Sequence, residues 1–170
     1  MSAIESTNSS ESHSGSTDAV PMQSARSARG RTFAVGDLDH WRRLLIDEEV
    51  RCQSTGFPAG VLSIDFGSSV AGARHNAERA QQVIDIVARH LEFTDRVCVV
   101  GPNQLGVLLI PLRNVHDAEL RAIEIDDSLT EAGIIAGLGW AVRRESGLVD
   151  AWARADGNAA TSHARSVHLH

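Results

Sequence analysis

The sequence contains no lysine and no tyrosine, so all 16 of its basic residues are arginines. These absences exclude a Schiff-base lysine, a P-loop lysine that binds phosphate, and a phenolic acid or base. Aromatic residues make up only 4% of the 170 residues, whereas hydrophobic residues make up 42%. The chain therefore has enough apolar residues to form a hydrophobic core, but that core must consist mainly of Val, Ile, Leu and Ala.

Positive charge, paired cysteines and long hydrophobic runs are also scarce. The net charge of −6 argues against general nucleic-acid binding, which needs clustered cations. Cys52 and Cys98 form no C-x-x-C pair, as is usual in a reducing compartment. No run approaches the roughly 20 apolar residues of a membrane helix, and the N-terminus lacks the apolar core of a signal peptide. We therefore expect a cytoplasmic protein that binds neither nucleic acid nor membrane.

The composition divides the chain into three parts. Residues 1–30 are rich in Ser, Gly, Thr and Glu, with few apolar side chains to offset the entropy of ordering, so we predict a disordered Ser-rich tail. Residues 31–165 have the length and apolar content of one folded domain. Residues 166–170 are predicted to fray.

Within residues 31–165, helical and strand patterns alternate. The predicted helices cover residues 38–53, 75–92, 117–129 and 148–165, and the predicted strands cover residues 61–66, 96–100, 105–110 and 133–142. Asp37 or Asp39 is the expected N-cap of the first helix, and Asp117 that of the third. Turn residues at 101–104 join two strands into a hairpin. The fold class is α/β (α+β): helices packed on a mixed sheet with a central hairpin, with Trp140 expected in the core.

Four segments, in this order, resemble a GGDEF (diguanylate cyclase) domain, whose fold is ferredoxin-like and related to the nucleotidyl cyclase palm. The strand VLSIDF, residues 61–66, is similar to the family's first strand, which ends in a metal-binding Asp. Residues 95–110 are similar to the signature hairpin, residues 135–141 to the late strand, and residues 154–156 to the R-A-D motif of the last helix. The family signature G-G-(D/E)-E-F is represented by Gly101, Pro102, Asn103, Gln104 and Leu105.

The resemblance also identifies departures at the family's functional positions. Both acids of the signature are replaced by amides, Asn103 and Gln104, and Pro102 has no N–H to offer a nucleotide. Asp65 is the one remaining carboxylate for a vestigial metal site, although Mg²⁺ prefers several hard oxygen ligands. The inhibitory R-x-x-D motif is left as Glu92 and Asp95, and the change of Arg to Glu92 reverses its first charge.

From these departures we predict a protein that is not an enzyme: a catalytically inactive GGDEF-like regulatory or protein-interaction domain in bacterial signalling. Its expected partner is another protein or a second copy of itself. No cofactor is expected, and Mg²⁺ only if a vestigial nucleotide site survives. The alternatives are a non-catalytic GTP or cyclic-di-GMP sensor, a diguanylate cyclase with an atypical active site, and another ferredoxin-like α/β domain.

Overall fold

The computed structural model describes residues 34–35, 37–67 and 73–167. The predicted disordered tail, residues 1–30, lies outside the described residues. The predicted frayed segment lies partly outside them, because the last helix continues to Val167. Among the described residues, no helix is long and apolar enough to cross a membrane.

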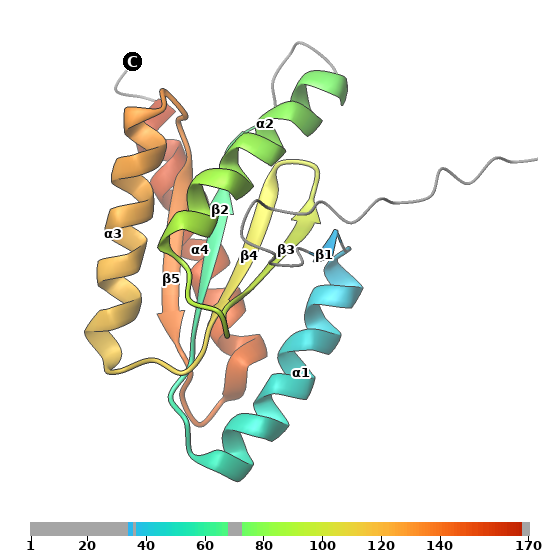
Figure 1. Ribbon diagram of the computed structural model, residues 1–170, viewed down its shortest axis with the longest axis vertical. Coiled ribbons are helices and arrows are strands. Elements are labelled where there is room, and N and C mark those ends of the chain that lie inside the picture. Colours follow the sequence, from blue (N-terminus) through green and yellow to red (C-terminus); the bar gives the residue numbers. More distant parts are fainter. Residues whose placement is uncertain (1–33, 36, 68–72, 168–170) are drawn as a thin grey trace, which may run out of the picture.

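The order of elements follows the predicted alternation of helices and strands (Figure 1). The elements are β1 (Ala34–Val35), α1 (Leu38–Thr55), β2 (Gly60–Asp65), α2 (Ala73–Val87), a 3-10 turn η1 (Ala88–His90), β3 (Arg96–Gly101), β4 (Gln104–Leu109), α3 (Val115–Glu131), β5 (Gly137–Val142) and α4 (Gly147–Val167). Three details differ from the prediction. The short β1 has no counterpart in it, and the last turn of the predicted helix 75–92 is η1 followed by extended backbone. The strand predicted for residues 133–142 begins only at Gly137.

The helix starts show which of the predicted N-cap residues cap their helices in the structure. Asp37 caps α1, as predicted, by accepting a hydrogen bond of 2.8 Å from the His40 N–H. The predicted cap of α3 is wrong, because the helix starts earlier and Asn114 accepts from the Asp117 N–H at 3.1 Å. Asp117 instead lies in the first turn, where its negative charge is favourable near the positive end of the helix dipole.

The strands form one sheet in the order β1-β3-β4-β2-β5. β1 pairs parallel with β3, and the remaining neighbours are antiparallel, so the sheet is mixed. β3 and β4 form the predicted hairpin. β4 also pairs with β2 in a register that places Gln104 opposite Asp65. The predicted fold class is therefore confirmed.

Helices cover both faces of the sheet, with α2 in front of it and α4 behind it in Figure 1. Side chains from alternate positions of β2 enter two separate cores. Leu62 and Ile64 pack with residues of α2 and α3, while Val61 packs with residues of α1 and α4. Burial on both faces explains why the strands read as nearly continuous apolar runs rather than as alternating ones.

Three small residues form a row across the α1/α4 face of the sheet, because Ser63 pairs with both Gly106 and Gly139. A Cβ at Gly106 would lie 2.7 Å from the Trp41 ring, and one at Gly139 would clash with the Ala155 carbonyl. Glycine is therefore required for the close approach of α1 and α4. This approach brings polar side chains of α4 to the strands that carry the predicted site.

Candidate functional site at the hairpin turn

Pro102 and Asn103 form the turn between β3 and β4, with Gly101 ending one strand and Gln104 starting the next. Pro102 is exposed, and its fixed φ suits the first corner of a turn. The ladder shifts register between Val99 and Gly101, which marks a bulge just before the turn. The segment 101–105 is thus a bend between adjacent antiparallel strands, as the sequence predicts.

The turn lies against the end of β2. The Phe66 N–H donates to the Asn103 carbonyl at 3.0 Å, and Asp65 is the cross-strand partner of Gln104. One carboxylate oxygen of Asp65 accepts from the Gly67 N–H at 3.0 Å. The structure therefore brings the predicted residues Asp65, Asn103 and Gln104 together, although they are about 40 residues apart in the chain.

A side chain from α4 completes this cluster. Gln104 Nε2 donates to Ser63 Oγ at 3.2 Å and makes a short hydrogen bond to Asp156 Oδ1. Ser63 Oγ also donates to Asp156 Oδ1 at 3.2 Å. Sequence reasoning missed Ser63 and Asp156 as parts of the site, yet two signals were present: a hydroxyl inside an otherwise apolar strand, and the carboxylate of the R-A-D motif.

Asn103 contains an acceptor without a partner. Its Oδ1 atom is buried, and no hydrogen bond reaches it from the described residues. A buried acceptor left unpaired costs about 1–3 kcal/mol. Such an atom is a position where a ligand with a suitably placed N–H or O–H group would gain a hydrogen bond.

The donor set of the turn suits a metal ion poorly. Asp65 supplies one carboxylate and Asn103 one neutral amide oxygen, whereas Mg²⁺ favours charged oxygen ligands in a strict octahedron. Across the described residues, no group of three or more His, Cys, Asp or Glu side chains lies close enough to hold a metal. The absence of a cofactor stays a prediction.

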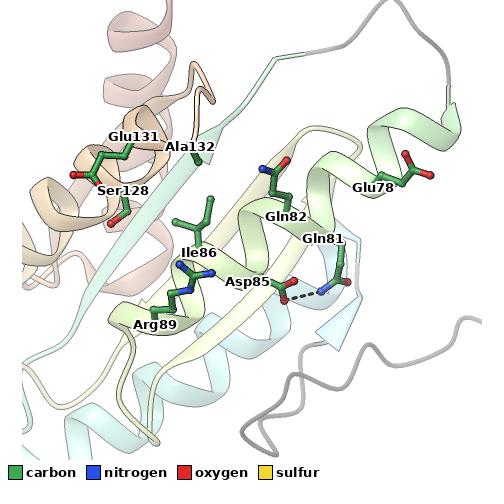
Figure 2. Close-up of a pocket in the computed structure, with 9 residues that line it drawn as sticks. All are labelled: Glu78, Gln81, Gln82, Asp85, Ile86, Arg89, Ser128, Glu131 and Ala132. Carbon is green, nitrogen blue, oxygen red and sulfur yellow. Dashed lines mark hydrogen bonds between the residues drawn. The ribbon is translucent and has the colours of Figure 1, made fainter.

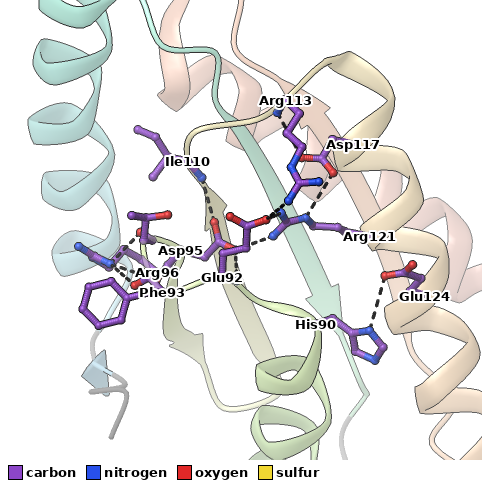
Figure 3. A network of polar contacts seen from close by, with 11 residues as sticks. His90, Glu92, Phe93, Asp95, Arg96, Ile110, Arg113, Asp117, Arg121 and Glu124 are labelled. Carbon is purple, nitrogen blue, oxygen red and sulfur yellow. Dashed lines mark hydrogen bonds and ion pairs between the residues drawn. The ribbon is translucent and has the colours of Figure 1, made fainter. Parts of the chain in front are cut away.

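The inhibitory-motif residues lie in a network of charged side chains elsewhere (Figure 3). Arg121 of α3 is buried and contacts Asp95 at 2.7 Å and Glu92 at 2.7 Å. Arg113 reaches Glu92 at 3.3 Å. The negative charge of Glu92, which reverses the first charge of the family motif, is therefore matched by two guanidinium groups.

Asp95 has a clear structural role within this network. Its carboxylate accepts from the backbone N–H groups of Glu92 at 2.7 Å and Ile110 at 3.0 Å. Burial nevertheless raises the pKa of the Asp95 carboxyl above its usual value. Arg121 is the residue that sequence reasoning missed, because nothing local in the sequence of α3 links it to residues 92–95.

A separate groove of about 540 Å³ lies between α2 and the end of α3 (Figure 2). Its lining includes Glu78, Asp85 and Glu131 together with Arg89, and it contains none of the predicted site residues. Gln81 bonds Asp85 along the helix at 3.0 Å. The mixed charges of this lining give it no chemical identity as a site.

The fold and the turn define an α/β domain with a mixed sheet and a hairpin. No family model matches the sequence, and no curated protein matches it. Solved structures do match, among them a DGC protein from Thermotoga maritima, with 16% identity over 74% of this chain and 95% of the other at a TM-score of 0.62.

Two further matches have the same fold. The FimX GGDEF domain from Pseudomonas aeruginosa is 12% identical over 77% of this chain and 90% of its own, with a TM-score of 0.61. The GGDEF domain of DgcB from Caulobacter crescentus, solved in complex with c-di-GMP, is 12% identical over 76% of this chain and 86% of its own, with a TM-score of 0.55. In fold, this chain is a GGDEF-like domain.

These matches correct one prediction. The sequence predicted that the chain is not an enzyme, on the ground that the signature acids are replaced. The fold it shares is that of a diguanylate cyclase structure, and at 12–16% identity the substitutions at the turn do not establish a lost activity. The residues assigned to the degenerate signature and to the inhibitory remnant stay predictions.

Proposed function

We propose that this chain is a regulatory domain of cyclic-di-GMP signalling that binds a guanine nucleotide at its hairpin turn. The observation that carries the proposal is the buried Oδ1 atom of Asn103, which accepts no hydrogen bond from the described residues. The guanine edge presents an amino donor, so it offers the kind of group that this acceptor lacks. Binding would then remove an energetic penalty that the free protein carries.

The surroundings of the turn support the proposal. Gln104 is fixed by hydrogen bonds to Ser63 and Asp156, and the Asn103 carbonyl is fixed by the Phe66 N–H. A turn that is already ordered loses little conformational entropy when a ligand binds. Asp65 lies beside it as a carboxylate that is only half-buried.

Isothermal titration calorimetry of the full chain with GTP and with cyclic di-GMP, each with and without Mg²⁺, tests the proposal. We expect saturable binding of at least one nucleotide. The Asn103→Leu variant should weaken it by roughly tenfold or more, because one hydrogen bond to a buried acceptor is removed. Chromatography of the GTP incubation shows in the same samples whether cyclic di-GMP is formed.

Asn114→Leu is the matched control, because it makes the same chemical change at a helix cap away from the turn. It should leave nucleotide affinity unchanged. No heat from either nucleotide at high micromolar protein would overturn the proposal, as would an equal loss of affinity in both variants.

Contact with another protein is a second candidate, and exposed apolar side chains on α1 favour it. Ile46 is 54% exposed and Val50 is 64% exposed, and they lie one helical turn apart on the outer surface. Sedimentation velocity over a range of concentrations tests self-association. We expect a dimer that the Val50→Arg variant dissociates, and a monomer at all concentrations would contradict self-association.

A further inference from the structure

The charges of the groove between α2 and α3 do not identify a ligand, but Ser128 in its lining has a contact with chemical meaning. The Oγ atom of Ser128 lies 2.9 Å from Nε2 of His90, a residue 38 positions away in the chain. A hydroxyl is a weak nucleophile unless a neighbouring base can take its proton. The contact therefore places a nucleophile and a general base within hydrogen-bond reach of each other at the wall of a groove.

A carboxylate lies on the other side of the His90 ring (Figure 3). Glu124 Oε2 is 3.7 Å from Nδ1 of His90, which is an ion-pair distance, and such contacts often shorten when a substrate binds. A carboxylate beside Nδ1 favours the tautomer that has its proton there, so Nε2 is left to accept from the Ser128 hydroxyl. The three side chains thus take the order of a nucleophile, a base and a group that orients the base.

Packed elements hold these side chains in place. Glu124 and Ser128 are four residues apart on α3, so one helical turn brings them to the same face. His90 ends η1 and is followed directly by the buried Leu91. The His90 side chain is only 20% exposed, whereas Ser128 faces the groove. A base that is shielded and a nucleophile that is accessible are what attack on a bound substrate requires.

The groove has the size and the lining for a small ester. Its volume of about 540 Å³ is within the range of small-molecule sites. Arg89 of η1 lies in the same lining as Ser128 (Figure 2), and a guanidinium there can stabilise the negative charge that develops on a carbonyl oxygen. The lining has more carboxylates than guanidinium groups, so a negatively charged substrate is disfavoured.

We propose that Ser128, His90 and Glu124 hydrolyse a small carboxylic ester that carries no negative charge. Ser128 Oγ forms a bond to the carbonyl carbon while His90 Nε2 takes the hydroxyl proton, and the π electron pair moves onto the carbonyl oxygen. When the bond to the leaving group breaks, the leaving oxygen takes this proton from His90. Water then attacks the acyl group on Ser128 in the same way, which releases the acid and restores the hydroxyl. This inference goes beyond the proposed nucleotide site and does not depend on it.

Hydrolysis of 4-nitrophenyl acetate by the full chain, followed by the absorbance of 4-nitrophenolate, tests the proposal. We expect turnover that Ser128→Ala abolishes and that His90→Gln reduces by about 100-fold or more, because the general base is lost. Glu124→Gln should reduce the rate by roughly tenfold, because an interaction with a charged group is lost. The half ester 4-nitrophenyl succinate, which adds a carboxylate, should be the poorer substrate. Equal rates with the two esters would contradict the substrate class.

Covalent labelling gives a readout that does not depend on turnover. Attack of Ser128 Oγ on the phosphorus of a fluorophosphonate expels fluoride and leaves a stable adduct, which mass spectrometry of the digested protein locates. We expect the adduct on Ser128 in the wild type and its loss in His90→Gln. Circular dichroism of each variant checks that the fold is intact.

Ser146→Ala and His116→Gln are the matched controls. Ser146 has a carboxylate rather than an imidazole as its partner, and His116 lies 3.5 Å from Glu119 as a second pair of imidazole and carboxylate. Both variants should hydrolyse the ester and take the label as the wild type does. The proposal is overturned if the wild type shows no turnover or no adduct on Ser128. It is also overturned if His116→Gln lowers the rate as much as His90→Gln, which would assign the hydrolysis to exposed imidazoles in general.

Discussion

Two polar clusters flank the hairpin, and they differ in how completely their groups are satisfied. In the network around Arg121, the buried guanidinium contacts three carboxylates, those of Asp95, Glu92 and Asp117. At the turn, Gln104 and Asp156 are paired, but Asn103 Oδ1 is not. A network in which the charges are paired stabilises a fold, whereas a buried acceptor left open is suited to a ligand. We therefore expect the first cluster to stabilise the fold, whereas the second is the cluster for which binding is proposed.

The largest expected effect comes from disrupting the network around Arg121. Arg121→Met leaves the buried carboxylate of Asp95 without its cation, so the free energy of unfolding should fall by about 3–5 kcal/mol. Urea denaturation followed by circular dichroism measures it. Adding Asp95→Asn to this variant should recover part of the loss, because it removes the unpaired buried charge.

Arg113→Met is the control, since Arg113 pairs with Glu92 from a side chain that is 80% exposed. Its effect should stay below about 1 kcal/mol. Equal losses in Arg121→Met and Arg113→Met would remove the distinction between a buried network and a surface ion pair.

The sequence predicted the hairpin and its proximity to Asp65 because both depend on local features: turn residues at 101–104, and two apolar strands of matching length. It did not predict which side chains from α3 and α4 complete the polar contacts of the two clusters. Asp156 reaches Ser63 across 93 residues only because Gly139 lets α4 approach the sheet. Arg121 meets residues 92–95 only through the packing of α3.

The cap of α3 and the short β1 were missed for other reasons. Asn114 lies just before the predicted helix, and the apolar stripe began too late to identify it as the cap. β1 has two residues, which is too short for any periodicity to detect. Element type was thus predictable here, while end positions and cross-chain polar contacts required the tertiary structure.

The ion pair of Glu49 with Arg143 is another contact in which the charges are paired, and its contribution to stability should depend on pH. Glu49 accepts from Arg143 at 2.6 Å and from the Leu148 N–H at 2.9 Å. The hydrogen bonds from Arg143 lower the pKa of the Glu49 carboxyl below its usual value. Its contribution to stability is therefore present above the unfolded pKa, near 4.5, and is lost as the pH falls through the folded pKa.

Glu49→Gln should lower the free energy of unfolding by about 1–3 kcal/mol at pH 7, and the difference from the wild type should shrink below about pH 4.5. The pKa of Asp95 is raised rather than lowered, so its effect on stability has the opposite pH dependence. Its contribution to stability is present below the unfolded pKa and is lost as the pH rises through the folded pKa. Chemical denaturation from pH 3 to 7 measures both trends. Glu145→Gln makes the same substitution at an exposed position, and it should change the free energy of unfolding at pH 7 by no more than about 0.5 kcal/mol.

The smallest expected effect concerns the cluster at the turn, and it is a gain of stability rather than a loss. Asn103→Leu removes a buried acceptor that has no partner, so the ligand-free protein should become more stable by about 1 kcal/mol. Asn114→Leu makes the same substitution at a helix cap and should instead reduce stability by about 1 kcal/mol. Urea denaturation of both variants compares the signs directly. A loss of stability in both would mean that Asn103 Oδ1 is already satisfied in the free protein, and the turn would then lack the open acceptor that distinguishes it from the network around Arg121.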